Sequence, residues 1–351
     1  MSRTRTWRGH DEIRCHAADL EAALEATGAQ VSARWPAVEV WLDHHQQEQP
    51  WAVLIEDERQ CLAVAVLSTR RRHGIRYVHS ATEVGTPAAV RARDHRAGVL
   101  LADQVVAEMS TSHRPWMLTL GLLPAFDPAA EALRARLKHA QSAPAQVVPL
   151  LNFDPESDVR RYLSRNTRSA IARARNRLDD ATGAQPELSW LTSPDQVSAV
   201  LADVIDLHRR RNRQLRDHAV LDDPAAARYF EDMVIGHAER DRLELLTARV
   251  KGDLAAFAVC FRGGATAWVY ANLVAPEWTE FSLGTIANAE VVRRFHAEPG
   301  TGCLDWGAGT ARYKLSGGAE VMKTQMLEGW SGWLIRVGSQ ISRLQLASGT
   351  P

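Results

Sequence analysis

The chain has 351 residues, of which 45% are hydrophobic and 24% charged, a composition typical of a globular protein that can bury a core. Its 42 basic residues balance 42 acidic ones, so the net charge gives no argument for a nucleic-acid or membrane partner, and only local charge could provide one. The length predicts two domains, since a domain usually has roughly 100–200 residues.

Cysteine spacing and apolar run length exclude several classes of protein. The four cysteines, Cys15, Cys61, Cys260 and Cys303, are isolated, with no CxxC pair and no histidine at ligand spacing, so we expect neither a disulfide framework nor a metal site. No apolar run approaches the roughly 20 residues that span a bilayer. We therefore expect a cytoplasmic protein without membrane insertion and without a tightly bound cofactor.

The first half of the chain begins with helical spacing and continues with strand patterns. Apolar residues predict helices within residues 11–46, and apolar runs broken by polar turns then predict a three-stranded meander. A helix, a strand, a second helix and a last strand follow. The strands are expected at residues 51–56, 61–67, 75–79, 116–120 and 147–153, and the two later helices at 91–109 and 127–139.

An arginine-rich helix at residues 158–178 and a loop at 179–186 connect this half to the next. The second half is expected to begin with a strand and two helices, and it then repeats the order of meander, helix and strand. Its strands are expected at residues 187–191, 243–250, 254–261, 266–272, 302–306 and 321–328, and its helices at 197–215, 225–238, from 282 onward, and at 334–346.

The repeated order indicates an internal duplication. An offset of 186 residues places Gly98 on Gly284 at the start of the helix that follows each meander, and Gly121 on Gly307 after the next strand. Identity is slight, so the order of elements carries the argument. A helix start has free N–H groups, and a glycine lets a phosphate approach them, so either helix start could bind an anion, and the sequence leaves open whether the first half binds a ligand.

Polar groups concentrate in residues 302–314, GCLDWGAGTARYK. A short apolar strand delivers Asp305, two glycines break it, and Tyr313 and Lys314 follow side by side. An acid, a phenol and an ammonium group at one strand end are typical of a functional site. Since the corresponding strand of the first half has Thr119 in place of Asp305 and no Tyr-Lys pair after it, the chemistry is expected in the second half.

With these motifs the chain resembles the GNAT acyltransferase superfamily, and more closely its doubled branch of CelD-like acetyltransferases and Fem-type aminoacyl transferases. The resemblance rests on residues 163–168 (LSRNTR), Leu207 and His208 with Arg210 and Arg211, the strand 265–272, the helix start 282–284, and LDWG at 304–307 followed by Tyr313 and Lys314. It implies an α+β fold of two tandem GNAT-like α/β/α halves with mixed central sheets, joined by the arginine-rich helix. The expected boundaries are 1–154, 155–185 and 186–351.

The resemblance also implies transfer of an activated acyl group to an amine on a small molecule or a peptide. The donor is acyl-CoA in most GNAT proteins and aminoacyl-tRNA in the Fem-type branch. The usual acyl-CoA pattern has a basic residue and two close glycines at the helix start, whereas each half here keeps one glycine. This difference and the basic helix favour aminoacyl-tRNA over acyl-CoA as co-substrate. A non-catalytic RNA-binding module on the same scaffold is a further alternative.

Acyl transfer to an amine needs a neutral amine, a polarised carbonyl and a route for the proton. Asp305 is expected to accept the amine proton, although a strand-end carboxylate can equally cap a turn. Lys314 is expected to hold an anionic group, and charge reversal at either residue is expected to abolish transfer while keeping the fold. Tyr313 and Tyr270 are candidate proton donors to the leaving group, with a structural role in the core as the alternative.

Three further groups complete the candidate site. His208 follows an apolar helix face and is a candidate base, although a histidine at such a boundary is often structural. Ser282 and Gly284 are expected to cap the helix start and to let a phosphate approach it. The seven arginines in residues 159–177, a stretch without one acidic residue, and a second cluster around Arg211 would suit the phosphates of CoA or of a tRNA acceptor stem. The phosphate-binding candidates among them are Arg161, Arg165, Arg168, Arg175 and Arg211.

Overall fold

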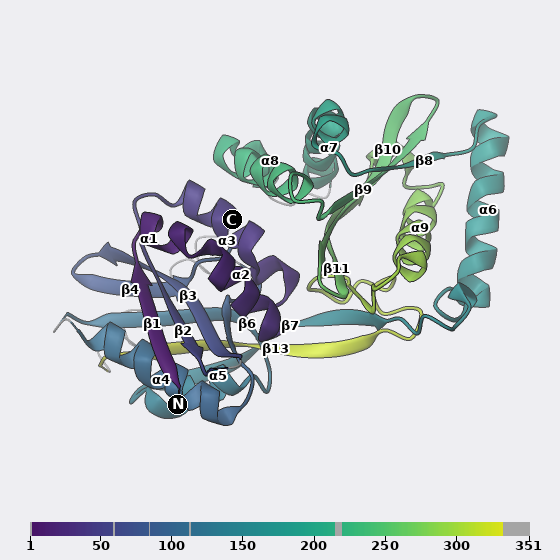
Figure 1. Cartoon of the computed structure of the whole chain (residues 1–351). Helices are drawn as coiled ribbons and strands as arrows, with labels where there is room; N and C mark the ends of the chain where they lie inside the picture. The colour runs from purple at the N-terminus through teal and green to yellow at the C-terminus, as the bar shows by residue number, and fades with distance from the viewer. Residues whose placement is uncertain (1, 59, 84, 112–113, 215–219, 333–351) are drawn as a thin grey trace. The chain divides into compact units, whose positions relative to one another are not determined.

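The structure of the protein is a computed structural model that describes residues 2–58, 60–83, 85–111, 114–214 and 220–332 (Figure 1). The chain forms two compact units. The first contains Met1–Gln146 and the residues from Lys323 onward, and the second contains Val147–Met322. Among the helices in the described ranges, none combines the length and the apolar character that crossing a membrane requires.

The first unit is built on a sheet with the strand order β1-β2-β3-β4-β6-β13, in which β4 and β6 are parallel and the other neighbours antiparallel. A short strand, β5, pairs with β3. Its strands and helices are β1 (Arg3–Arg8), α1 (His10–Cys15), α2 (Ala17–Ala26), α3 (Trp35–His44), β2 (Gln49–Glu56), β3 (Cys61–Arg72), β4 (Ile75–Ser80), β5 (Val90–Ala92), α4 (His95–Ser110), β6 (Trp116–Pro124) and α5 (Pro128–Arg136).

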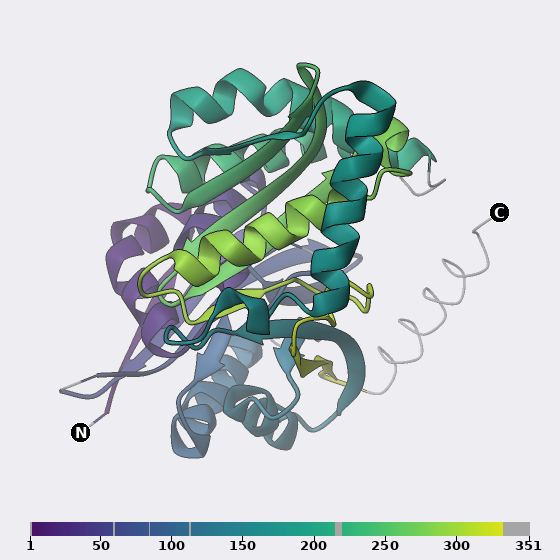
Figure 2. The same cartoon turned by 90° about the vertical axis from the view of Figure 1, so that its right-hand side faces the viewer.

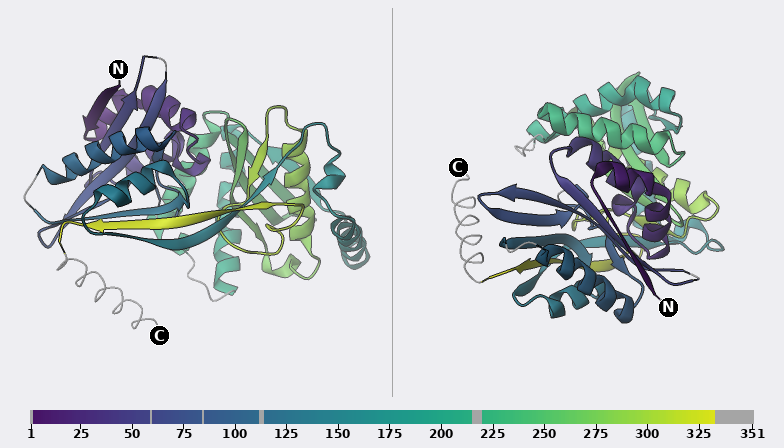
Figure 3. Two further views of the ribbon diagram at one scale, coloured as in Figure 1. Left: turned by 90° about the horizontal axis from the view of Figure 1, so that it is seen from below. Right: turned by 60° about the vertical axis from the view of Figure 1, so that its left-hand side comes forward.

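Both faces of this sheet are covered by helices (Figure 3). Leu101 and Met109 of α4 pack on one face, and Leu24 of α2 and Trp41 of α3 pack on the other. Because both faces are buried, β2 and β3 are almost continuously apolar instead of alternating. The meander and the helix that follows it, expected from these apolar runs, are confirmed.

The strand β1 was not expected from the sequence. It pairs with β2 in antiparallel fashion, and only Trp7 of its six residues is buried. Arg5 reaches Asp19 at 2.9 Å and Glu56 at 2.8 Å. An edge strand that is held by its backbone ladder and by ion pairs has no run of apolar residues, so periodicity could not reveal it.

The second unit repeats this topology with the order β8-β9-β10-β11-β12-β7, in which β11 and β12 are parallel. Its strands and helices are α6 (Arg165–Thr182), β8 (Glu187–Leu191), α7 (Pro194–Gln214), α8 (Pro224–Ala238), β9 (Leu243–Val250), β10 (Asp253–Gly263), β11 (Thr266–Val274), α9 (Leu283–Ala297) and β12 (Cys303–Asp305). The duplication expected from the element order is therefore present in the structure.

The arginine-rich helix α6 is part of the second unit, where it lies beside α9 (Figure 2). The side chain of Ser164 caps its start by accepting the N–H of Thr167 at 3.1 Å, and Gly183 ends it in a left-handed conformation with φ 66°. Its buried residues Ile171, Ala174 and Leu178 have helical spacing, so one stripe packs inward while the arginines occupy the rest of the surface.

The last strand of each half is exchanged. Residues 150–152 of β7 (Ala140–Asn152) pair with β12 in the second unit, whereas residues 324–330 of β13 (Glu320–Trp330) pair with β6 in the first. The structural units therefore differ from the expected boundaries at 154 and 185. The amphipathic helix expected at 334–346 lies outside the described residues.

The two glycine-containing helix starts differ in structure. In the first unit the carboxylate of Asp94 accepts the N–H of Ala97 at 2.8 Å, and a Cβ on Gly98 would clash with the carbonyl oxygen of Pro128 at the start of α5. Gly98 therefore allows two helices to pack closely, and a carboxylate occupies this helix start. Anion binding, which the sequence left open for either helix start, is therefore not favoured at this one.

Burial of His237 on α8 makes stability depend on pH. Its ring stacks 3.7 Å from that of Phe261, and its Nδ1 lies 2.8 Å from the carbonyl oxygen of Met233. Burial lowers the pKa of His237 from 6.5 to about 4. Between these pH values the unfolded chain binds more protons, so this contribution is complete above pH 6.5 and is lost as the pH falls toward 4.

We expect His237 to reduce the free energy of unfolding by about 3 kcal/mol between pH 7 and pH 4. The substitution His237→Gln keeps a donor for the Met233 carbonyl but removes this titration. Urea denaturation at pH 7, 5.5 and 4 measures both proteins. A pH dependence as steep in the variant as in the wild type would contradict the assignment.

Candidate active site

The site begins where two parallel strands part. β11 and β12 pair only through residues 266–268 and 303–305, after which β12 ends and β11 continues to Val274. A β-bulge lies in this free part of β11, because Ala271 pairs with Val259 and Val269 with Cys260, which leaves Tyr270 as an extra residue. The bulge changes which side chains face α9 and takes the backbone of Tyr270 out of the regular ladder.

A cavity of about 350 Å³ occupies this position in the second unit. Its walls are the end of β11, the first turns of α9, and single side chains from α7 and from the segment after β12. Among the residues that line it are Arg211, Asn272, Thr279, Ser282, Gly284, Thr285, Asn288 and Tyr313. The structure thus brings together four of the predicted site residues, namely Arg211, Ser282, Gly284 and Tyr313.

A chain of hydrogen bonds crosses one wall of the cavity. The hydroxyl of Tyr313 donates to Oδ1 of Asn272 at 3.1 Å, and Nδ2 of Asn272 donates to Oδ1 of Asn288 at 2.9 Å. Burial raises the pKa of Tyr313, while its hydrogen bond to Asn272 acts in the opposite direction. Tyr313 is therefore a protonated phenol at neutral pH and can donate a proton but cannot accept one.

The start of α9 faces the same cavity. Ser282 adopts a left-handed conformation with φ 57°, and its side chain caps none of the described backbone N–H groups, so the expectation that it caps the helix is wrong. Its Oγ instead lies 3.1 Å from Nη2 of Arg177. The first N–H groups of α9 and the guanidinium of Arg177 favour a negatively charged ligand here.

Two further features adapt this helix start to a ligand. A Cβ on Gly284 would lie 3.1 Å from Cγ2 of Val274, so the glycine keeps the space between the helix and β11 open. Arg211 approaches from α7, where its Nη1 lies 2.7 Å from Oε1 of Gln214 and 3.4 Å from Oγ1 of Thr279. The next residue toward the N-terminus, Arg210, pairs with Glu277 at 2.9 Å.

Asp305 has a different position from the one expected. It is 4% exposed, and its Oδ1 accepts the N–H of Gly307 at 2.7 Å, while Gly307 has a left-handed φ of 69°. Its carboxylate caps the turn that ends β12, which is the structural alternative that the sequence left open. Because this carboxylate is buried, charge reversal at Asp305 would place an unpaired cation in the interior, and we now expect it to cost stability as well as activity.

Lys314 is held by the same turn. Its Nζ donates to the carbonyl oxygen of Ala308 at 2.8 Å. Burial lowers the pKa of Lys314, and the negative charge of Asp305 opposes this shift. The thiol of Cys303 is no nucleophile, because burial and the charges of Asp305 and Glu320 raise its pKa to about 11. The turn that holds Asp305 and Lys314 also leads into Tyr313, whose ring packs edge-on against Trp306 with ring centroids 5.6 Å apart.

The other predicted catalytic residues lie in an aromatic cluster. Tyr270 stacks on Phe230 and Phe261 with ring centroids 5.6 and 5.0 Å apart. His208 lies 6.1 Å from Phe230, and burial lowers its pKa, so it is neutral at pH 7. Neither side chain is among those that line the cavity. Their contacts correspond to the structural alternative that the sequence left open.

The predicted arginines of α6 and its preceding turn do not gather at the cavity. Arg161 pairs with Asp154 at 3.3 Å, and Nη1 of Arg168 donates to the carbonyl of Leu163 at 2.7 Å. Arg165 is exposed and Arg175 is half-buried. Arg177 of this helix is the one that reaches the helix start of α9.

Sequence reasoning did not identify Asn272, Asn288 and Arg177 as site residues. A weak signal existed for Asn272, which is a lone amide in the largely apolar strand β11, whereas Asn288 lies in a helix with several other polar residues. Arg177 carried no signal that set it apart from six neighbouring arginines. Its contact with Ser282 joins residues 105 positions apart in the sequence.

Comparisons with known proteins agree with this geometry. Residues 165–315, from the start of α6 to the residue after Lys314, match the family model of the acetyltransferase (GNAT) domain. A search of curated proteins finds no match. The matched segment contains every residue named above as lining the cavity.

Several solved structures share the fold over most of the chain. A crystal structure of FemX has a TM-score of 0.59 at 9% identity and covers 91% of this chain and 96% of its own. L-PGS from Bacillus licheniformis has a TM-score of 0.54 at 11% identity, with 93% and 96% covered. A conserved protein of unknown function from Bacteroides thetaiotaomicron has a TM-score of 0.55 at 10% identity, with 90% and 96% covered. At these identities the likeness is one of fold.

Two variants of Asp305 separate turn capping from proton transfer. The amide oxygen of Asp305→Asn can still accept the Gly307 N–H, whereas Asp305→Ala leaves that N–H without its acceptor. We expect Asp305→Asn to keep its activity within about tenfold of the wild type and Asp305→Ala to lose about 1–2 kcal/mol of unfolding free energy. Acyl-transfer rates and urea denaturation measure both effects. Loss of activity in Asp305→Asn with an unchanged fold would instead show that the carboxylate takes part in the chemistry.

Proposed function

We propose that this chain is an N-acyltransferase of the GNAT superfamily whose reaction takes place at the cavity between β11 and the start of α9; the match of residues 165–315 to the acetyltransferase (GNAT) domain supports this. The activated acyl or aminoacyl group enters as an ester or thioester, and an amine on a small molecule or peptide attacks its carbonyl carbon. A C–N bond forms, the C–O or C–S bond breaks, and the amine loses one proton to the solvent or the leaving group.

The observation that carries this proposal is the open helix start of α9. The first N–H groups of α9 supply positive charge at the cavity, and so do Arg177 and Arg211. The side chain of Ser282 makes no capping hydrogen bond to the described N–H groups at this end of the helix. A donor that carries phosphates would bind here through charge-assisted hydrogen bonds. The strand β11, with its bulge at Tyr270, would hold the acyl group beside the phosphates.

Tyr313 is the residue we assign to the leaving group. Its hydroxyl lines the cavity and already donates to Asn272, so a small rotation directs the same proton to a ligand oxygen or sulfur. Its raised pKa keeps the phenol protonated. Asp305 and Lys314 act as positioning residues, since they hold the turn that presents Tyr313.

The arginines on the outer surface of α6 favour aminoacyl-tRNA as the donor. The helix has 18 residues and is about 27 Å long, and Arg165, Arg173 and Arg177 are exposed along it. Such a length exceeds what the phosphates of a small donor can contact, whereas a nucleic-acid backbone can follow it. A charged tRNA is also available in the cytoplasm, where we place the reaction.

Acyl-CoA is the alternative donor. The cavity is compact, at about 350 Å³, and the matched family model is described as an acetyltransferase domain. In this case the helix start and Arg211 would hold the phosphates of CoA, and a thiol would leave. The amine acceptor and the role of Tyr313 would be the same for both donors.

Substitution of Tyr313 tests the assignment of the leaving-group acid. We expect Tyr313→Phe to lower kcat by about 10²- to 10⁴-fold, because the phenol proton is lost while the ring keeps its contact with Trp306. Tyr270→Phe is the matched control, since its ring belongs to the aromatic cluster, and it should retain most activity. Steady-state kinetics measure kcat of both variants, and circular dichroism checks that they are folded. An equal effect of the two substitutions would remove Tyr313 from the mechanism.

The donor is identified by incubating the purified full chain with charged total tRNA or with a mixture of acyl-CoA thioesters and an amine mixture. We expect tRNA to be discharged, the activity to be sensitive to ribonuclease, and the rate to fall steeply with salt because α6 contacts phosphates. Neutralising Arg165 and Arg173 together should weaken the salt dependence. Release of free thiol that is insensitive to ribonuclease would establish acyl-CoA, and discharge of neither donor would contradict the proposed function.

A further inference from the structure

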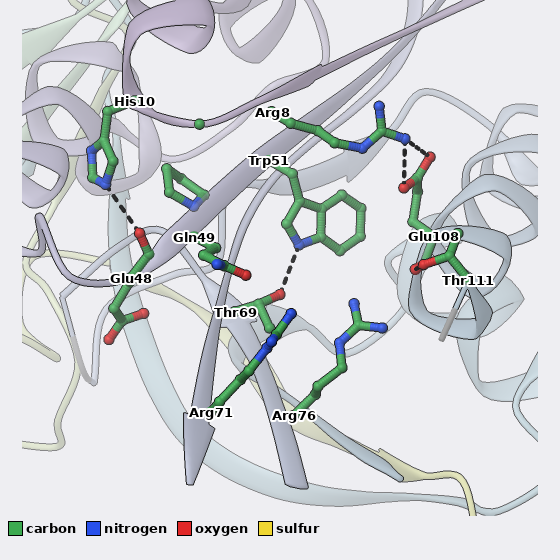
Figure 4. Close-up of a pocket in the computed structure, with 12 residues that line it drawn as sticks. Arg8, His10, Glu48, Gln49, Trp51, Thr69, Arg71, Arg76, Glu108 and Thr111 are labelled. Atoms are coloured by element: carbon green, nitrogen blue, oxygen red, sulfur yellow. Dashed lines mark hydrogen bonds and ion pairs between the residues drawn. The ribbon is translucent and has the colours of Figure 1, made fainter. Parts of the chain in front are cut away.

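A second cavity, of about 450 Å³, lies wholly in the first unit (Figure 4). It opens where α4 ends at Ser110, because the strands β3 and β4 beneath the helix continue past its last turn. The floor comes from the start of β2, the end of β3 and the start of β4, and the walls from Arg8 and Glu108. It shares no residue with the cavity at α9.

A rigid centre supports this cavity. Trp51 is 6% exposed, and its Nε1 donates to Oγ1 of Thr69 at 3.1 Å, which fixes the plane of the indole ring. Thr69 and Arg71 lie two residues apart on β3 and therefore on the same face of the sheet. The floor is thus a preformed surface with one large aromatic side chain.

The carboxylates that line the cavity are already paired. Glu108 accepts two hydrogen bonds from Nη2 of Arg8 at 2.7 and 2.8 Å. The carboxylate of Glu48 accepts the hydroxyl of Ser68 at 2.9 Å and lies 2.8 Å from Nε2 of His79. Both acids are therefore engaged by their own partners.

The other two arginines that line the cavity, Arg71 and Arg76, are neighbours across two strands. Arg71 on β3 and Arg76 on β4 are directly opposite in the antiparallel ladder, so their side chains leave the sheet on the same face, as Figure 4 shows. In the part of the chain that the structure describes, neither forms an ion pair with a carboxylate. Like charges directly opposite in a ladder destabilise it, so this pair needs a compensating anion.

Arg76 is anchored in place. Its Nη1 donates to the carbonyl oxygen of Met109 at 3.1 Å in the last turn of α4, where the helix dipole favours a cation. Burial lowers the pKa of Arg76, the positive charge of Arg71 adds to this shift, and Glu108 acts in the opposite direction. The guanidinium is therefore partly desolvated and oriented before any ligand arrives.

We propose that this cavity binds a small organic phosphate monoester, with the phosphate between Arg71 and Arg76 and the organic part against Trp51. A phosphate monoester carries about −1.5 to −2 charges at pH 7, which matches two guanidiniums, whereas a carboxylate would neutralise only one. The planar forks of two arginines also provide enough donors for three phosphate oxygens.

The size of the cavity supports an organic ligand over a free ion. Its volume of about 450 Å³ is within the range of small-molecule sites and far exceeds that of one phosphate. Pro50, Gly9 and the edge of Trp51 offer an apolar lining beyond the arginines. The site does not depend on the acyl-transfer chemistry, because all of its residues belong to the first unit.

Isothermal titration of the full chain with phenyl phosphate tests the proposal. We expect binding to the wild type and a loss of at least about tenfold in affinity in Arg71→Gln, because a charge-assisted bidentate contact is removed. Arg70→Gln is the matched control, since the neighbouring Arg70 points to the opposite face and lies over the ring of Tyr77 at 5.9 Å. This control should keep the affinity of the wild type. Arg211→Gln should keep it as well, because that residue belongs to the cavity at α9.

Benzoate at the same ionic strength separates a phosphate site from a carboxylate site, and we expect it to bind at least about tenfold more weakly than phenyl phosphate. Three results would overturn the proposal. The first is that Arg71→Gln and Arg70→Gln bind phenyl phosphate with equal affinity. The second is that benzoate binds as tightly as phenyl phosphate, and the third is that phenyl phosphate does not bind up to about 10 mM. Loss of binding in Arg211→Gln alone would assign the phosphate to the cavity at α9 and would equally exclude this site.

Discussion

The candidate active site depends on the parting of β11 and β12. Two parallel strands normally continue together, but β12 ends at Asp305 because its carboxylate captures the N–H of Gly307 and the chain turns through a left-handed glycine. β11 runs on without it and contains a bulge at Tyr270. Tyr313 borders the space that this leaves, as does the start of α9, so the hydrogen bond between Asp305 and Gly307 helps to shape the candidate site.

The same topology has different uses in the two units. In the first, β6 continues to Pro124 and pairs with β13, and the start of α4 is capped by Asp94 and packed against α5 through Gly98. In the second unit, the side chain of Ser282 does not cap the start of α9 and instead lies beside the guanidinium of Arg177. A duplicated fold thus keeps a packed helix start in one copy and an open, positively charged one in the other.

The first unit carries positive charge in another place. Arg71 and Arg76, which form no ion pair with a carboxylate among the described residues, lie near the C-terminal end of α4, whereas Glu108 is paired with Arg8 and Glu48 with His79. Each unit therefore has one concave surface with an excess of positive charge, although the two surfaces occupy opposite ends of the equivalent helices. This difference follows from strand length, because β3 and β4 extend past α4 whereas β11 extends past β12.

The order of elements was determined by the sequence alone. Helix and strand periods act over a few residues, so they can be read from neighbours in the chain. For the same reason the sequence indicated the segment 302–314 and the helix start at Gly284. It did not reveal β1, whose ladder and ion pairs replace an apolar pattern.

Only the tertiary structure decided how these parts meet. It exchanged the last strands of the two halves, made Asp305 a turn cap, separated Tyr270 and His208 from the cavity, and brought Asn272 and Arg177 to it. The contacts of Tyr313 with Asn272 and of Ser282 with Arg177 join residues 41 and 105 positions apart, and the exchanged strands pair residues still farther apart in the sequence. These partners are set by the packing of distant backbone. No local pattern specifies such a partner, which is why the sequence could point to segments that line the candidate site but not to the contacts within it.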